Sequence, residues 1–309
     1  MLAILIGLII GIGLPIQTSI NSRLKFSVGS PLVASLISFS LGTLFLALIT
    51  IFFDKSLFFS LNLFRKEPVW LWLGGLLGVI YLTSNILLFP KLGSVQTVIM
   101  PILGQIIMGL VIDNFGLFDS LVHPLNWSRI IGAILVIIGV VGAVSINQII
   151  LYRHKKFLPD RTNNFWYYRL IGIVVGMFSA TQTAINGHLG IVLNSSVKAA
   201  FISFFVGTIS LIVIVAIIHP RLSFQKSKEN PWWLWLGGLI GALFVLGNVY
   251  LVPKIGTGLA VVIVLVGLII GSLLIDQFGW FRSAKNPITF AQIVSLLIMI
   301  FGVVIIRLL

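Results

Sequence analysis

Two pairs of side-chain amides lie inside long apolar segments of this sequence. Gln17 and Asn21 form the first pair, and Gln182 and Asn186 form the second pair 165 positions later. Within each pair the amides are four residues apart, so they share one face of a helix. An amide in hydrocarbon without a partner costs several kcal/mol, so such groups normally face a neighbouring helix or a cavity. The pairs therefore either hold helices together or line a binding site for a polar molecule.

Other polar and aromatic side chains in the apolar segments fit the same two interpretations. Hydrogen bonds between membrane helices average only about 0.6 kcal/mol, and packing explains such residues as well as ligand binding does. Two of the tryptophans stand near the beginning of apolar segments, where an aromatic belt at the membrane surface is the alternative. The candidate substrate-binding residues are Gln17, Asn21, Asn85, Gln105, Gln182, Asn186, Asn248, Trp72 and Trp235.

The inventory of reactive side chains argues against an enzyme. The chain has no cysteine, and its four histidines fall at the ends of apolar segments, in different loops. The seven acidic residues avoid the middle of these segments, so no paired carboxylates and no Ser-His-Asp arrangement can form there. We therefore expect no catalytic residue, no metal site and no cofactor.

The composition indicates a membrane protein. Of 309 residues, 59% are hydrophobic and 9% are charged, and the mean hydropathy is +1.16. Soluble domains average about 25% charged residues. No charged residue occurs from Phe26 through Phe53, which is longer than a helix needs to cross a bilayer. Because these runs lack the alternation of a membrane β-barrel, we predict an all-α polytopic membrane protein.

The net charge of +13 has an ordinary explanation in such a protein. Lys and Arg at the ends of membrane helices set the orientation of the chain, and here the 20 basic residues are spread over the loops. No basic stripe or groove-reading motif is present. We therefore expect the lipid bilayer and a small-molecule substrate as partners, and no nucleic acid.

The apolar segments predict ten membrane spans. They lie at about 2–20, 31–53, 69–90, 94–113, 128–149, 168–187, 197–218, 232–252, 256–276 and 288–308. A polar stretch with several basic residues separates the fifth span from the sixth. We predict a first five-helix repeat at 1–150, a basic linker at 151–166 and a second five-helix repeat at 167–309.

The two halves carry the same motifs in the same order. Gly42-Thr43 recurs as Gly207-Thr208, and the tryptophan-rich segment 70–78 recurs as 233–241 with one difference. The matched polar residues of the later spans are Asn85 with Asn248, Lys91 with Lys254, and Asp113 with Asp276. Because each half has five spans, the second must enter the membrane from the opposite side, which predicts two inverted repeats. Most Lys and Arg then lie on one face, and the positive-inside rule places both termini outside the cytoplasm.

These motifs resemble a known transporter family. Five-span repeats, an early Q-T-x-I-N, W-L-W-L-G-G and D-x-F-G-x-F are similar to the drug/metabolite transporter superfamily, and within it to the YdcZ-like branch of inner-membrane exporters in its fused two-repeat form. The resemblance covers all but the central linker. It implies ten helices around a central cavity, a bacterial inner (plasma) membrane, and export of small molecules. Small multidrug-resistance relatives carry a glutamate in their first helix, whereas the first and sixth spans here contain no acid.

From the residues and the resemblance together we expect a secondary transporter. A cavity lined by amides and hydroxyls would suit a neutral or zwitterionic metabolite or drug-like molecule, carried by alternating access. Without a centrally placed ionisable group, we expect a substrate gradient, or an ion bound through neutral oxygens, to drive transport. A channel or facilitator, and a non-transporting membrane assembly partner, stay open as alternatives. The fused repeats favour a monomer, and a homodimer stays open.

The repeated charges suggest a gate. Lys91 and Lys254 follow the prolines that end the third and eighth spans, and Asp113 and Asp276 end the fourth and ninth. Inversion would place Lys91 with Asp276 on one face and Lys254 with Asp113 on the other. We interpret the four residues as candidate gating residues that form two ion pairs. The alternative is that each charge extends separately to the lipid headgroups.

Overall fold

The structure is a computed structural model of the chain. It describes residues 2–58, 60, 62–154, 165–220, 231–255 and 257–308, without the side chains of residues 144–154, 248–250, 252–255, 257–260 and 307–308. The regular structure within these ranges is helical, with no strand. The candidate side chains of Asn248 and Lys254, and most of the predicted linker at 151–166, therefore lie outside the described residues.

The described helices of the first half follow the predicted apolar segments. Ser30 in extended conformation and Pro31 at the first turn begin the second helix, and Lys55 in the left-handed region ends it. The elements are α1 (Leu2–Val28), α2 (Pro31–Asp54), α3 (Leu63–Lys66), the 3₁₀ turn η1 (Val69–Trp72), α4 (Gly74–Phe115), η2 (Leu117–Asp119) and α5 (Trp127–His154).

The second half repeats this order without a counterpart of α3 among the described residues. The Ser195 hydroxyl accepts a hydrogen bond from the Lys198 amide and so caps the second long helix of this half. The elements are α6 (Phe165–Val192), α7 (Ser196–Ile218), η3 (Trp232–Leu236), α8 (Gly237–Ile255), α9 (Thr257–Phe278), η4 (Trp280–Arg282) and α10 (Phe290–Leu308).

Helix α4 is broken at one residue. Gly93 has φ 77° and ψ 176°, a conformation that glycine adopts without strain, and the chain is helical on both sides of it. The break lies between the predicted third and fourth spans. It frees backbone N–H groups at the start of the second segment, because those amides have no acceptor four residues earlier.

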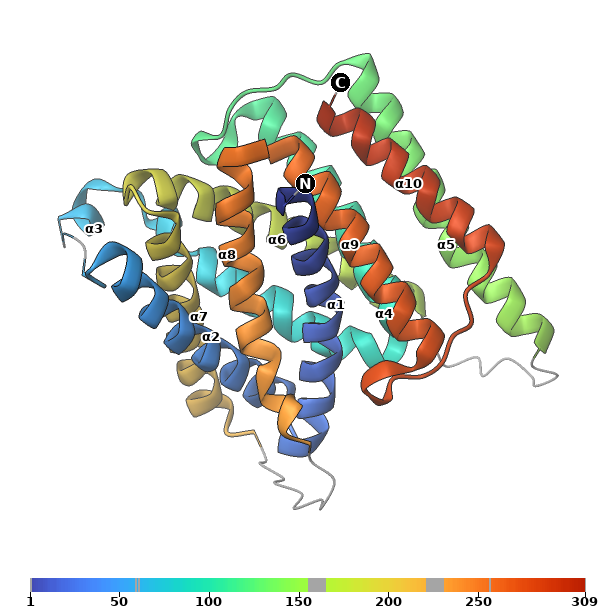
Figure 1. The fold of residues 1–309 in the computed structure, drawn as a ribbon, viewed down its shortest axis with the longest axis horizontal. Coiled ribbons are helices and arrows are strands. Elements are labelled where there is room, and N and C mark those ends of the chain that lie inside the picture. Colours follow the sequence, from blue (N-terminus) through green and yellow to red (C-terminus); the bar gives the residue numbers. More distant parts are fainter. Residues whose placement is uncertain are drawn as a thin grey trace.

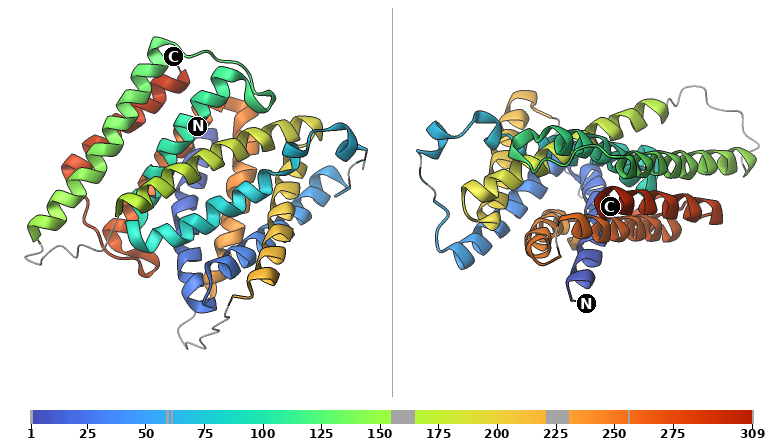
Figure 2. Two further views of the ribbon diagram at one scale, coloured as in Figure 1. Left: turned by 180° about the vertical axis from the view of Figure 1, so that it is seen from behind. Right: turned by 90° about the horizontal axis from the view of Figure 1, so that it is seen from above.

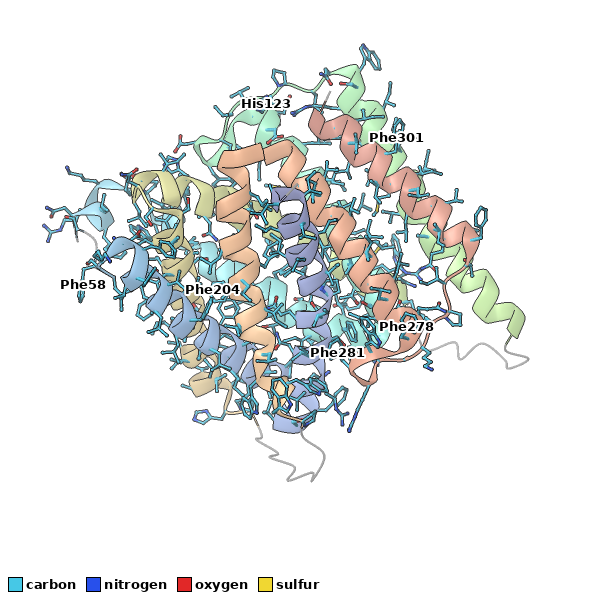
Figure 3. The ribbon with its side chains drawn as sticks, in the orientation of Figure 1. Phe58, His123, Phe204, Phe278, Phe281 and Phe301 are labelled. Atoms are coloured by element: carbon cyan, nitrogen blue, oxygen red, sulfur yellow. The ribbon has the colours of Figure 1, made fainter. Side chains whose placement is uncertain are left out.

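Six described helices are long and apolar enough to cross a membrane: α1, α2, α4, α6, α7 and the part of α9 from Val261 to Phe278. Shorter apolar stretches lie in α5 (Trp127–Ala143), α8 (Trp232–Gly247, with η3) and α10 (Phe290–Ile306). The outward faces of the bundle are apolar, and Figure 3 shows Phe58 and Phe301 directed away from it. The chain is therefore a polytopic helical membrane protein.

The helices of one half pack against those of the other. Figure 1 shows α1 between α8 and α9, and Figure 2 shows α6 along α4. In addition, α2 packs on α7, and α5 lies beside α10 at one edge of the molecule. Both termini lie on the side of the bundle where α8 ends, opposite the end of α1 (Figure 1). The first helix of each half thus packs mainly on the third and fourth spans predicted for the other half.

Candidate functional site

The first amide pair faces glycines of the second half. Asn21 is fully buried, and its Nδ2 donates a hydrogen bond to Ser38 Oγ on α2 at 3.0 Å. Its Oδ1 lies so close to Gly237 of α8 that a Cβ there would overlap it. Gln17, one turn earlier, meets Gly241 in the same way. The pair therefore seats α1 on the glycine face of α8.

The second amide pair repeats this arrangement on the opposite helices. Asn186 Nδ2 donates to Ser203 Oγ on α7 at 3.0 Å, and its Oδ1 lies against Gly74 at the start of α4. A Cβ at Gly78 would lie 2.6 Å from Gln182 Nε2. Both amides of this pair are only partly buried, whereas both amides of the first pair are buried. The structure is therefore more open at the second pair.

A third set of contacts joins equivalent residues of the two halves. Thr43 Oγ1 and Thr208 Oγ1 are 2.8 Å apart in a hydrogen bond between α2 and α7. Beside them the rings of Phe39 and Phe204 pack with centroids 5.1 Å apart, and Figure 3 shows Phe204 inside the bundle. Contacts between equivalent residues are what a local two-fold axis produces.

The amides of α4 hold polar contacts of their own. Gln105 Nε2 donates to Ser179 Oγ of α6 at 3.0 Å, which adds a hydrogen bond to the α4–α6 contact. Asn85 is 3% exposed, and its Oδ1 has no hydrogen-bond partner among the described atoms. Three buried amide oxygens, those of Asn21, Asn85 and Asn186, share this condition. Each could accept a hydrogen bond from a polar ligand or a water molecule.

The two candidate tryptophans lie in the 3₁₀ turns that precede the glycine faces. Trp72 packs against Phe64 with the rings tilted by 30° and their centroids 4.1 Å apart, and Trp235 is 52% exposed. The half-exposed ring of Trp235 favours the aromatic-belt interpretation for that residue.

A different tryptophan pair makes the repeated aromatic contacts. Trp70 packs edge-on against Phe118, and Trp233 packs in the same way against Phe281. Both phenylalanines have positive φ and belong to the repeated D-x-F-G-x-F motif. These four aromatic residues are not among the candidates predicted above, although the repetition of the motif was a signal that could have identified them.

Two of the predicted gating residues, Asp276 and Lys91, have described contacts with groups other than each other. Asp276 is 3% exposed, and its two carboxylate oxygens accept hydrogen bonds from the backbone amides of Ser94 at 2.8 Å and Val95 at 3.1 Å. Lys91 Nζ lies over the ring of Tyr168, 5.9 Å from its centroid. The carboxylate is drawn to the amides freed by the break at Gly93, which a reading of charges along the sequence could not include.

The equivalent aspartate of the first half pairs with an arginine. Asp113 Oδ2 lies 3.4 Å from an Nη of Arg129 on α5, within its own half. The side chain of Lys254, its predicted partner, lies outside the described residues. A gating role for these four residues stays a prediction.

The comparison with protein families covers both halves of the chain. The model described as "Putative inner membrane exporter, YdcZ" matches residues 2–142 and again residues 167–305. The chain belongs to this family. The region between the two matches contains the linker predicted at 151–166.

The fold of this YdcZ-family chain is also similar to that of a solved structure. One solved structure, titled only "Crystal structure of protein", has a TM-score of 0.56 and 14% sequence identity, and covers 98% of this chain and 97% of its own. At that identity the likeness concerns the fold. A comparison with curated proteins finds no match.

The hydrogen bonds between the halves involve both neutral and charged side chains. Thr43 and Thr208 form a neutral pair, whereas Asp276, Arg169 and Asp54 each take part in a hydrogen bond to the other half. The described residues hold no group of three or more His, Cys, Asp or Glu that could bind a metal.

Proposed function

We propose that this chain is a secondary transporter that exports a small neutral or zwitterionic molecule across a bacterial inner membrane. The observation that carries the proposal is the family match, which spans both halves of a polytopic helical chain. The buried amides at the contacts between the halves support a neutral polar binding site near the middle of the chain's apolar bundle. Alternating access would then occur by movement of one half against the other.

The proposed architecture is ten spans in two inverted repeats. The break at Gly93 supports counting α4 as two spans, and the correspondence of α1 on α8–α9 with α6 on α4 supports the inversion. The proposed units are 1–150, 151–166 and 167–309. By the distribution of Lys and Arg, both termini would lie outside the cytoplasm, and the fused repeats would allow a monomer to act.

Single cysteines test the inversion directly, because the natural chain has none. We expect Phe26→Cys, at the end of α1, and Ile191→Cys, near the end of α6, to react with a membrane-impermeant maleimide from opposite sides of the membrane. Both residues are more than half exposed, so the label can reach them. Labelling of both from the same side would contradict the inverted repeat.

A metabolite screen tests the function. We expect a subset of neutral or zwitterionic compounds to raise the melting temperature of the purified protein, because ligands that bind only the folded state stabilise it. Those compounds should then show saturable counterflow in proteoliposomes. Flux without counterflow would favour a channel or facilitator. Absence of flux for every stabilising compound would favour a non-transporting membrane partner.

A further inference from the structure

The side chain of Asp276 is a buried carboxylate that the proposed transport cycle does not yet use. It stands near the end of α9, and both oxygens accept backbone amides at the N-terminus of the second segment of α4. The contact joins residues 181 and 182 positions apart, so it ties the second half to the first. The hydroxyl of Ser94, the residue that supplies one of these amides, is buried without a described partner.

The two halves treat their equivalent aspartates differently. The loops after Asp113 and Asp276 have the same backbone hydrogen bond. The backbone N–H of His123 donates to the backbone carbonyl of Asp113, and the backbone N–H of Asn286 donates to that of Asp276, both at 2.8 Å. In this shared frame Arg129, the cationic partner of Asp113, corresponds to Gln292. The second half therefore keeps the acid and replaces the base with a neutral amide.

The described cations near this end of the molecule form no salt bridge with Asp276. The charged residues on the elements packed against the end of α9, in the loop that follows it, or beside the amides of residues 94 and 95 are Arg23, Lys25, Lys91, Arg169, Arg282 and Lys285. Arg169 Nε donates to Gln96 Oε1 at 3.1 Å. Lys25 and Lys91 lie over the rings of Phe26 and Tyr168. The salt bridges recorded between described side chains do not include Asp276. Its negative charge is thus balanced by two amide dipoles at a helix N-terminus.

The carboxylate of Asp276 binds a proton more readily once the second segment of α4 moves away from it. The two N–H donors favour the ionised carboxylate, whereas burial disfavours it. If the second segment of α4 withdraws, the carboxylate loses the two donors that favour its ionised form, and a proton from solution then binds to one oxygen. By linkage, protonation must in turn weaken the contact with Ser94 and Val95.

We propose that Asp276 is a proton-binding site, and that its protonation releases α9 from the broken helix α4. The inference rests on the proposed transporter function for its role, which would be to couple proton movement to the movement of the halves. It differs from our sequence-based expectation, in which the lack of a centrally placed ionisable group favoured a substrate gradient, or an ion bound through neutral oxygens, as the driving force. The apolar segments placed Asp276 at a span end, where water would reach it, and the structure buries it.

Hydrogen–deuterium exchange of the protein in lipid nanodiscs tests the site without a substrate. At about pH 8 the amides of residues 94 and 95, corrected for intrinsic chemical rates, should exchange about 10- to 100-fold more slowly than in Asp276→Asn. Between about pH 8 and pH 5 the wild-type protection should fall toward that of the variant. Protection that is the same in both proteins, or that does not change with pH in the wild type, would overturn the proposal.

Two further variants control the experiment. Asp113→Asn removes the arginine-paired acid, and it should leave the pH response at residues 94 and 95 unchanged. Gln292→Arg supplies the missing cation at the equivalent position, so protection should persist to lower pH than in the wild type. That variant also decides the question if Asp276→Asn does not fold, because an unchanged pH response in Gln292→Arg contradicts the proposal.

The outcomes separate this inference from the proposed function. If the contact depends on pH but the protein transports none of the compounds, the proton-binding site is supported and the transporter function is contradicted. If Asp276→Asn still accumulates an identified compound when driven by a proton gradient, the transporter function is supported and the coupling role of Asp276 is contradicted.

Discussion

Replacing Gly176 with alanine is expected to force α6 away from α4 and to lower the melting temperature of the protein. A Cβ at this position would overlap the carbonyl oxygen of Pro101 and lie 2.6 Å from Pro101 Cα. These are backbone atoms, so no side chain can rotate away to make room. Overpacking of this kind costs about 1–3 kcal/mol, and more where backbone must move. Thermal unfolding in detergent, followed by intrinsic fluorescence, would measure the loss.

Gly187→Ala provides the matched control on the same helix. No atom lies within 4 Å of a Cβ added there, and alanine is favoured over glycine in a helix by roughly 1 kcal/mol. We therefore expect the melting temperature of this variant to stay level or to rise. If both substitutions lower it equally, the close approach of α6 to α4 is not the cause.

Asn21→Asp is expected to destabilise the bundle by at least about 1–3 kcal/mol, the cost of a buried polar group left without a partner, which is larger for a charged group. Asn21 is 0% exposed, and only one described hydrogen bond, to Ser38, engages its amide. A carboxylate would replace the Nδ2 that now donates to Ser38 Oγ with an oxygen, and it would leave a charged oxygen against Gly237, whose Cα offers no strong donor. The measurements are the yield of monodisperse protein and its melting temperature.

The exposed residue Asn194 supplies the control for that substitution. It stands at positive φ in the turn between α6 and α7, a conformation that aspartate also tolerates. Asn194→Asp should therefore have the same melting temperature as the wild type. A normal melting temperature for Asn21→Asp would show that water or another donor reaches the α1–α8 contact.

The class of protein, its helical segments and its internal repetition could be predicted from the sequence, because they depend on composition and on spacing within a segment. The partners of the amides could not. Gln17 and Asn21 share a helix face by their spacing, but that spacing does not say that α8 covers the face. The contact of these amides with the glycines of α8 appears only when distant segments are brought together.

The aspartates show a second limit. Asp276 was placed on the correct segment, and inversion was expected to bring it to the end where Lys91 lies. Its hydrogen bonds depend on a single backbone conformation, the positive φ of Gly93, which releases two amides at that point. The sequence indicated an interruption between the third and fourth spans, but not the backbone conformation that leaves two amides there without acceptors, so it could not name these amides as partners of Asp276.

The packing of α1 on α8 and α9 has a consequence for biosynthesis. The first helix leaves the ribosome and enters the translocon long before α8 is synthesised. Gln17 and Asn21 are therefore in the bilayer before the α8 glycines that they contact in the folded protein are present. Until then the side chains of Gln17 and Asn21 face lipid, water or an insertion chaperone in place of the glycines of α8, while Asn21 can already donate to Ser38 on α2. The nascent chain should thus remain vulnerable to quality-control proteases until its last third has been inserted.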